Sequence, residues 1–252
     1  MMRGSGRKHD EVRPLQADLD FIAYPEGSVL FSMGGTRVLC NASIERGVPA
    51  WMQKKGIPGG WITAEYSMLP RATHTRSPRE ISKPRARSQE IRRLIGRSLR
   101  AAFKLENLPE VTCIVDCDVL QADGGTRTAS ISGGYLALAL ALSRDSVVME
   151  AGSDVFLPAI AAVSAGVVDG ESLVDLDYKE DSSADFDLNV VANSQGALVE
   201  VQGTAEAGLI GRGEFVNLLT LAECALKEIL AFQYESLTSL GVELSGDVWG
   251  ED

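Results

Sequence analysis

Apolar and polar residues alternate with a period of two through much of the first half of the chain, the spacing of a half-buried β-strand. The glycine pair Gly34-Gly35 interrupts the longest of these runs, so we expect that run to fold into a hairpin. A mixture of Pro, Gly and Lys from Arg46 to Gly60 predicts a loop. The alternation predicts strands over residues 15–22, 28–44, 61–66 and 111–120.

Helical spacing occurs twice in the same half. From about Ser88 to Lys104, apolar residues recur every three or four positions, which predicts an amphipathic helix with Ser88 as its N-cap. A second stripe on this helix is basic and consists of Arg93, Arg97, Arg100 and Lys104. The small and apolar residues from Ser130 to Leu142 predict a second, buried helix.

The second half begins after a polar connection, Ser143 to Pro158, and again places strands before a helix. Strands are expected at residues 159–168, 171–178, 186–192 and 197–203, and an amphipathic helix at 214–232. We expect a mobile tail over residues 1–11 and frayed residues after 232. The repeated order predicts an α/β fold in which two halves, 13–143 and 158–232, share one core and form one compact structural unit.

Charge is distributed unevenly. The formal net charge is −11, yet Arg71 to Lys104 contains eleven Lys or Arg against two Glu, a net +9. The remaining residues carry 13 basic and 33 acidic groups, a net −20. Such segregation indicates either a polyanion-binding surface or a solvated basic helix face. The proline-broken, arginine-rich segment 70–79 favours the first, because its charge continues into the basic helix; an exposed, mobile connection is its alternative.

The apolar runs, the N-terminal residues and the cysteines bear on where in the cell the protein is found. No apolar run approaches the roughly 20 residues that span a membrane, and residues 1–10 do not form a signal peptide. Two of the four cysteines, Cys113 and Cys117, alternate with valines on one strand face and are expected in the core. We therefore expect a reducing, cytoplasmic location with no membrane partner.

The first candidate site is the sequence Gly124-Gly125-Thr126-Arg127, which joins a predicted strand to a predicted helix. A helix N-terminus offers unpaired N–H groups and partial positive charge, and the glycines let an anion approach closely. Phosphate is the expected ligand, although a tight turn capped by Thr explains the same four residues, and no Walker motif occurs. The same tetrapeptide at residues 34–37 precedes a strand, so we interpret that copy as a hairpin turn without special chemistry.

The second candidate site is acidic. Six carboxylates crowd residues 175–187, and most of them are explained as an acidic turn that keeps the protein soluble. Asp181 and Asp187 flank this turn, where carboxylates hold Mg²⁺ or give a proton to a leaving oxygen. His9 and His74 are the only histidines in the sequence, which argues against a histidine metal site or triad. Together with the glycine turn and the basic segment, these carboxylates indicate phosphoryl chemistry on nucleic acid.

Four blocks of sequence, in order, resemble the ribonuclease PH family of phosphate-dependent exoribonucleases, which trim the 3′ ends of transfer RNA. The resemblance extends from about Arg13 to Phe232 and implies two βαβ-type halves with a left-handed crossover, as well as dimers that assemble into a hexameric ring. The sequence departs from the family's glycine-rich linker at residues 81–86, which affects the expected loop shape. The four blocks are residues 60–76, 87–97, 116–127 and 175–190.

The resemblance also implies roles for single residues. Inorganic phosphate would be bound by Arg87, Gly125, Thr126 and Arg127. Asp181 and Asp187 match the family's Mg²⁺ and acid–base candidates, with Asp187 as the proton donor. The incoming strand would be held by arginines that match Arg71, Arg76 and Arg79. The basic stripe of the helix adds Arg93 and Arg97 as RNA-binding candidates.

These expectations describe a phosphorolytic tRNA nucleotidyltransferase that releases nucleoside diphosphates from tRNA precursors and other RNA 3′ ends, and that also runs in reverse as nucleotide addition. Three other functions compete with it. The chain could be a catalytically silent RNA-binding subunit of an exosome-like ring. It could be a structural oligomer whose basic stripe serves assembly. It could also be a hydrolytic nuclease that uses water and is inhibited by phosphate.

Overall fold

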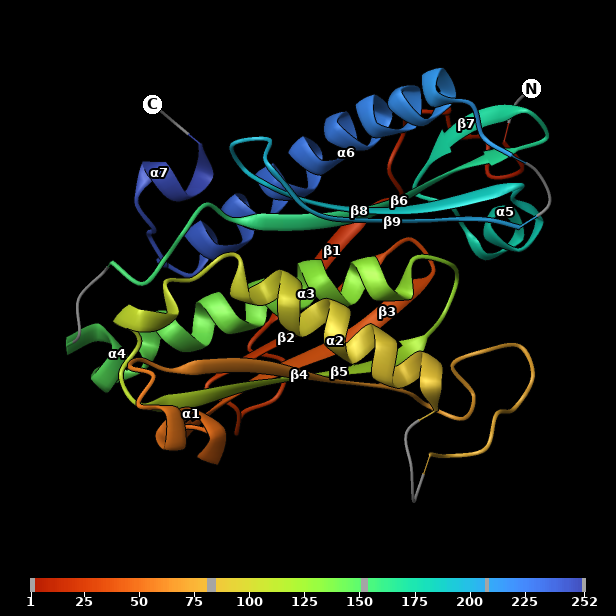
Figure 1. Cartoon of the computed structure of the whole chain (residues 1–252). Coiled ribbons are helices and arrows are strands. Elements are labelled where there is room, and N and C mark those ends of the chain that lie inside the picture. Colours follow the sequence, from red (N-terminus) through yellow and green to blue (C-terminus); the bar gives the residue numbers. More distant parts are fainter. Residues whose placement is uncertain (1–2, 81–84, 151–153, 207–208, 251–252) are drawn as a thin grey trace.

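The computed structural model describes residues 3–80, 85–150, 154–206 and 209–250. Two sheets are separated by the helices α2 (Ala86–Arg100) and α3 (Thr126–Arg144) (Figure 1). The long helix α6 (Arg212–Ser239) covers the outer face of the second sheet. A continuous hydrophobic core includes residues of both sheets and of all three helices. The expected α/β fold of two halves that share one core is therefore confirmed. No helix among the described residues is long and apolar enough to cross a membrane.

The first sheet follows the predicted alternation closely. Its strand order is β1-β2-β3-β5-β4, and the hairpin between β2 and β3 turns at Gly34-Gly35 as expected. Only β4 and β5 pair in parallel here, and α2 connects them, which makes this the crossover unit of the first half. The strands are β1 Leu15–Leu19, β2 Gly27–Met33, β3 Thr36–Arg46, β4 Trp61–Met68 and β5 Val111–Gln121.

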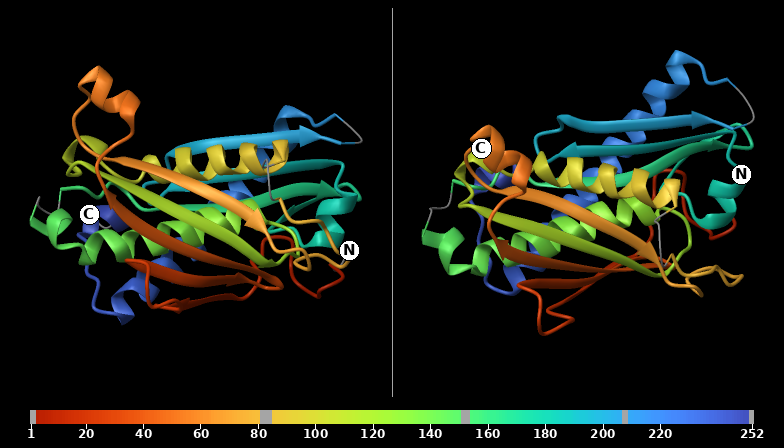
Figure 2. Two further views of the ribbon diagram at one scale, coloured as in Figure 1. Left: turned by 90° about the horizontal axis from the view of Figure 1, so that it is seen from below. Right: turned by 60° about the horizontal axis from the view of Figure 1, so that its bottom comes forward.

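Because β4 and β5 are parallel, their carboxyl ends lie at the same edge of the sheet. The irregular segment that follows β4 lies at that end, and the short helix α1, Ala50–Lys55, lies at the opposite end (Figure 2). The turn that follows β5 leads directly into α3, Thr126–Arg144. Helix α3 is buried from Thr128 to Leu142, slightly more than predicted, and packs against both sheets.

Helix α2 spans Ala86–Arg100, so the predicted bounds of Ser88 and Lys104 are wrong at both ends. The N-cap is Arg85 instead of Ser88, and the Arg85 side chain makes no capping hydrogen bond. The Glu80 carboxylate lies beside this end of the helix, where it accepts hydrogen bonds from the Arg85 backbone N–H at 3.0 Å and from the Ser88 hydroxyl at 2.9 Å. At the other end Phe103 leaves the helix to bridge with Phe156. The intended apolar face remains buried, since Ile91, Leu94, Ile95 and Leu99 are all in the core.

The second sheet has the order β7-β6-β8-β9, and all of its pairs are antiparallel. Its four strands lie where four were predicted, although β7 is shorter than expected and residue 178 begins a helix instead. The elements are β6 Ile160–Val168, β7 Glu171–Val174, α5 Tyr178–Ser183, β8 Phe186–Asn193, β9 Leu198–Ala205, α6 Arg212–Ser239 and α7 Gly246–Trp249.

Two predicted connections contain short helices. Helix α1 lies within the expected loop 46–60. It buries Met52, and Gly56 ends it in the left-handed region. Helix α4, Ser146–Glu150, lies within the expected connection 143–158, where Val148 is buried; residues 151–153 of that connection lie outside the described part. A 3₁₀ turn, η1, covers Leu105–Asn107.

Both predicted tails are wrong where they are described. Arg3 and Arg7 of the N-terminal segment are buried, with 7% and 8% of their surfaces exposed. At the C-terminal end, helix α6 continues to Ser239, and α7 returns to the body, where the Trp249 ring packs edge-on against Tyr135 and Tyr234. Residues 1–2 and 251–252 lie outside the described chain.

Candidate active site

The turn between β5 and α3 is shaped by two glycines with positive φ. Gly124 has φ 73°, and Gly125, the N-cap of α3, has φ 61°. A Cβ at Gly124 would lie 2.4 Å from the carbonyl oxygen of Leu176, so only glycine fits between the two halves here. Within the described chain no side chain caps α3, so its first-turn N–H groups remain available to an anion. We call residues 123–127 the glycine loop.

The earlier copy of the tetrapeptide, at residues 34–37, lies directly beside the glycine loop. It forms the expected hairpin turn, and in addition it makes structural contacts that the sequence does not predict. Thr36 is fully buried, and its hydroxyl donates to the Gly124 carbonyl at 2.6 Å while accepting from the Asp123 N–H at 2.9 Å. Gln121 also donates to the Gly35 carbonyl at 2.6 Å. The hairpin turn at residues 34–37 thus fixes the backbone of the glycine loop.

Replacement of Thr36 by valine is expected to lower the free energy of unfolding by about 1–3 kcal/mol, because the buried Gly124 carbonyl and the part-buried Asp123 N–H lose their partner. The loosened glycine loop should also raise the KM for phosphate. Thr112→Val is the matched control, since the Thr112 hydroxyl donates to the Gly47 carbonyl at 2.8 Å at the opposite end of the sheet. Denaturant melts and steady-state kinetics of both variants measure the two effects; equal KM values in the two variants would contradict the bracing role.

The two side chains at the end of the glycine loop, Thr126 and Arg127, are held by hydrogen bonds. The Thr126 and Tyr66 hydroxyls lie 2.9 Å apart, and burial raises the pKa of Tyr66 so that it stays a neutral hydrogen-bonding group. Arg127 donates to Gln202 at 2.7 Å and to Glu90 at 3.2 Å. The partners of Thr126 and Arg127 therefore come from α2, β4 and β9, which are distant in sequence.

The acidic turn is a short helix. Asp177 caps α5 by accepting from the N–H groups of Lys179 and Glu180 at 3.0 and 3.1 Å, and the Glu180 carboxylate returns to the Asp177 N–H at 3.0 Å. This reciprocal capping box fixes where α5 begins. Asp181 therefore projects from the helix rather than from a flexible turn, and Asp187 follows at the start of β8.

Four of the predicted site residues meet at one place. Arg87, Arg127, Asp181 and Asp187 line a cavity of about 390 Å³, and the same four line an adjoining cavity of about 380 Å³ that reaches the glycine loop. The second cavity is also bordered by Gly125 and Thr126. The structure therefore brings together all six residues predicted to bind phosphate or to act as carboxylates, from both halves of the chain.

The electrostatics of the two aspartates differ from those of surface carboxylates. Burial and then the Asp181 charge raise the pKa of Asp187 to about 6, and Arg127 opposes the rise. Burial likewise raises the pKa of Asp181, while Arg87 and Arg127 oppose it. A carboxyl with a pKa near neutrality can carry a proton to a leaving oxygen, which is the property expected of a general acid.

The donors present fit a hydrated Mg²⁺ rather than a fully enclosed ion. Among the described residues no group of three or more His, Cys, Asp or Glu is arranged to hold a metal. Two carboxylates, Asp181 and Asp187, line the cavity, and their mutual repulsion raises the Asp187 pKa, so a divalent cation between them would be favourable. Mg²⁺ binds in this way, through one or two carboxylates together with waters and substrate phosphates.

The raised pKa of Asp187 predicts a pH-dependent cost to folding. The Asp187 carboxyl binds its proton more tightly in the folded protein than in the unfolded chain, where its pKa is about 3.9. Proton binding therefore contributes fully to the free energy of unfolding below about pH 3.9, and this contribution is lost as pH rises through about 6. In EDTA, Asp187→Asn should therefore be more stable than the wild type by about 1–2 kcal/mol at pH 8, and the difference should shrink toward pH 4. Urea melts across this range measure it; a constant difference would contradict the assigned pKa.

The five predicted RNA-binding arginines lie outside the cavity. Arg71, Arg76 and Arg79 are exposed on the irregular segment 69–80, which contacts the site through the Ala122 N–H donating to the Ala72 carbonyl at 2.8 Å. On α2, the exposed Arg93 and Arg97 line a groove of about 380 Å³, and Arg97 also pairs with Glu200 at 2.7 Å. The unusual linker residues 81–84 lie outside the described chain, so the departure noted at 81–86 stays a prediction.

Sequence reasoning missed the residues that hold the site together. Tyr66, Glu90, Asn189 and Gln202 all line the site or bond to its residues, and the Asn189 amide donates to Asp187 at 3.2 Å. No local pattern identifies them, because each belongs to a different element. A clearer signal existed for α5, since Asp177 and Glu180 have the spacing of a capping box.

Comparison with known proteins gives the class of protein that this fold and site define. Sequence models of the 3′ exoribonuclease family match both halves: domain 1 matches residues 11–143, and domain 2 matches residues 159–225. Ribonuclease PH of Bacillus subtilis is 50% identical over 242 residues, which cover 94% of this chain and 97% of that protein. Ribonuclease PH of Bacillus velezensis is 49% identical over the same shares.

The fold is that of an RNA-processing exoribonuclease. More specifically, the chain belongs to the ribonuclease PH family, the phosphate-dependent 3′-to-5′ exoribonucleases with tRNA nucleotidyltransferase activity. The resemblance seen in the sequence is thus confirmed, and the catalytically silent ring subunit is not favoured.

Solved structures agree on the fold. Rice Rrp46 superposes with a TM-score of 0.76 at 17% identity, covering 93% of this chain and all of that one. An Archaeoglobus fulgidus exosome with RNA bound to the active site gives a TM-score of 0.74 at 25% identity, covering 91% and 92%. The chain therefore shares its overall fold with these two proteins.

Proposed function

We propose that this chain shortens the 3′ ends of tRNA precursors one nucleotide at a time, with inorganic phosphate bound at the start of α3 as the nucleophile. The observation that carries the proposal is the convergence of Arg87, Arg127, Asp181 and Asp187 on a cavity that opens onto the glycine loop. Phosphate-dependent exoribonucleases need an anion site and an acid within reach of one phosphodiester. This cavity offers both.

Phosphate binding would use the free N–H groups of the glycine loop, the Thr126 hydroxyl and the two guanidinium groups of Arg87 and Arg127. An oxygen of this phosphate attacks the last phosphodiester of the RNA in line. Charge spreads over the equatorial oxygens in the transition state, where fixed donors stabilise it without reorganisation. Arg127 must exchange its bonds to Glu90 and Gln202 for the phosphate, which makes those residues its resting partners.

The bond between phosphorus and the departing 3′ oxygen breaks as the new bond forms. Asp187, held by Asn189 and with a pKa of about 6, gives its proton to that oxygen. The products are a nucleoside diphosphate and an RNA shorter by one residue. The bond broken and the bond formed are both phosphoryl linkages, so abundant diphosphates should drive nucleotide addition in reverse.

Mg²⁺ held by Asp181, and by Asp187 once that carboxyl has given up its proton, would supply charge neutralisation for the phosphodiester. Asp181 suits this role because α5 fixes its position beside the cavity. The exposed arginines Arg71, Arg76 and Arg79, together with Arg93 and Arg97, would hold the RNA body, and their charge predicts a steep salt dependence of binding.

Assembly and location extend the proposal. We propose a homohexamer built as a trimer of dimers, supported by the exosome assemblies among the structural neighbours. We place the protein in the cytoplasm, because all four cysteines are free and three of them are buried. Size-exclusion chromatography with light scattering tests the assembly.

The proposed reaction is tested with a tRNA precursor that carries a short 3′ extension, incubated with Mg²⁺ in the presence and absence of inorganic phosphate. Nucleoside diphosphates should be released only with phosphate. Monophosphates released without phosphate would indicate hydrolysis and overturn the assignment of the nucleophile. Bound but unchanged RNA in both reactions would indicate a silent subunit.

A further inference from the structure

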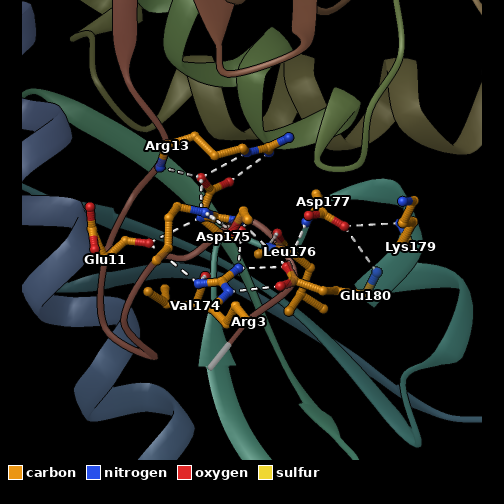
Figure 3. A network of polar contacts seen from close by, with 12 residues as sticks. Arg3, Glu11, Arg13, Val174, Asp175, Leu176, Asp177, Lys179 and Glu180 are labelled. Atoms are coloured by element: carbon orange, nitrogen blue, oxygen red, sulfur yellow. Dashed lines mark hydrogen bonds and ion pairs between the residues drawn. The ribbon is translucent and has the colours of Figure 1, made fainter. Parts of the chain in front are cut away.

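Three arginines of the N-terminal segment converge on the loop that precedes α5 (Figure 3). Arg3, Arg7 and Arg13 are each less than a tenth exposed, and they face two buried carboxylates, Asp175 and Glu180. We call these five residues the arginine clamp. None of them lines the cavity that holds the predicted catalytic groups.

Asp175 is the centre of the arginine clamp. It is fully buried and has a positive φ of 50°, a conformation that non-glycine residues rarely adopt. Its carboxylate accepts from the backbone N–H of Arg13 at 2.7 Å and from two guanidinium nitrogens of the same residue, Nε at 2.9 Å and Nη2 at 2.7 Å. Arg7 approaches the same carboxylate at 3.4 Å. A buried charge needs such partners, because an unpaired one is very costly.

One end of the arginine clamp reaches the glycine loop. The Arg13 Nη1 donates to the carbonyl of Asp123, and its Nη2 lies so close to the loop that a Cβ at Gly125 would be 3.2 Å away. Its aliphatic part packs under Gly34, in the hairpin that braces the same loop. Arg13 therefore supports the backbone that presents N–H groups to phosphate.

The other end reaches the acidic helix. Arg3 binds Glu180 with two bonds, from Nε at 2.7 Å and from Nη2 at 2.5 Å, and its Nη1 donates to the Val174 carbonyl at 2.9 Å. Glu180 is the capping-box residue of α5, and Asp181 is its neighbour in sequence. Helix α5 has six residues, too few to be stable alone, so its position depends on such contacts.

We propose that the arginine clamp sets the distance and orientation between the phosphate-binding loop and the acidic helix, with Arg13 and Arg3 as separate positioning residues for the reaction. Arg13 controls how well phosphate is held, and Arg3 controls how well Asp181 and its Mg²⁺ are held. This inference rests on the proposed function. Buried ion pairs add little net stability, so a role in precise placement accounts for a cluster of five charges.

Two variants separate the two ends. Arg13→Lys keeps the charge but loses the forked contact to Asp175 and the bond to Asp123, and should raise the KM for inorganic phosphate about tenfold with little change in the Mg²⁺ concentration for half-maximal rate. Arg3→Ala should do the reverse, raising the Mg²⁺ requirement about tenfold at an unchanged KM for phosphate. Arg3→Lys should recover part of the Arg3→Ala loss.

Arg144→Ala is the control, because Arg144 forms an exposed ion pair with Asp20 at the far end of α3 and should change neither constant. Hydrogen exchange monitored by mass spectrometry gives a second readout that does not depend on activity. Exchange should quicken at residues 123–127 in Arg13→Lys and at residues 177–183 in Arg3→Ala. If Arg3→Ala does not fold, Arg3→Lys is compared with Arg13→Lys instead, and we expect a smaller rise in its Mg²⁺ requirement.

The result that overturns the arginine clamp is a lowered unfolding midpoint with both kinetic constants unchanged, or with both raised equally in each variant. Failure of the proposed function is distinguishable from failure of the arginine clamp, because it is seen in the wild-type enzyme. A wild-type enzyme that needs neither phosphate nor Mg²⁺ refutes the proposed function. If the wild type needs both, the comparison between the variants decides whether the arginine clamp has its proposed role.

Discussion

Replacement of Arg127 by alanine is expected to lower the rate of phosphorolysis by about 10³-fold while RNA binding changes little. The guanidinium lies at the cavity that receives phosphate, and an arginine that stabilises transferred phosphoryl charge contributes about 10³–10⁵ in rate. RNA affinity should persist because the exposed arginines of segment 69–80 and of α2 are untouched. Release of nucleoside diphosphate from a labelled RNA measures the rate, and filter binding measures the affinity.

Arg144→Ala is again the matched control, since it removes the same side chain from the last turn of the same helix. Its rate should equal that of the wild type. The variant Arg127→Ala should also lose the dependence of its residual rate on phosphate concentration. Equal phosphorolysis by Arg127→Ala and wild type would exclude Arg127 from the nucleophile site.

Asp187→Asn is expected to reduce turnover in saturating phosphate and Mg²⁺ by about 10²–10⁴-fold, the range for loss of a general acid. The amide keeps the shape of the side chain and its contact with Asn189, but it has no proton to give and is a poorer Mg²⁺ ligand. Single-turnover rates separate this chemical defect from product release.

The stability of the same variant provides its control. Because Asp187→Asn should be at least as stable as the wild type above pH 6 in EDTA, a loss of turnover cannot be attributed to unfolding. Retained turnover would move the proton donor to another group, and Asp181 is the nearest candidate in the cavity.

Alternation and helical spacing located nearly every strand and long helix, because they record which faces of β2, β3, β5 and α3 are buried. Element ends were less predictable. Helix α2 begins with Arg85 as its N-cap, a residue type that does not favour that position, while the Ser88 hydroxyl donates to the Glu80 carboxylate eight residues earlier. Local propensity favours serine as the cap and does not include this contact.

The candidate site was predictable where its chemistry is concentrated in short motifs, such as the glycine loop and Asp187. The residues that hold the site in place were not predictable. Thr36 bonds to residues 87 and 88 positions away, and Arg13 pairs with a residue 162 positions away. The N-terminal arginines have the composition of a solvated tail, and only the fold shows that they are enclosed. The sequence contained one usable hint, the repeated tetrapeptide, but not the contact between its copies.

The pairing of Arg13 with Asp175 also orders events during synthesis of the protein. The arginine leaves the ribosome early, and its partner follows 162 residues later, about 8–30 s at about 5–20 residues per second. Until then Arg13 lacks the carboxylate that holds it beside the glycine loop, and Asp181 and Asp187 have not been made. With those carboxylates as the proposed catalytic groups, we expect an unfinished chain not to degrade RNA, including the message that is being translated, and activity to begin only when the second half has folded onto the first.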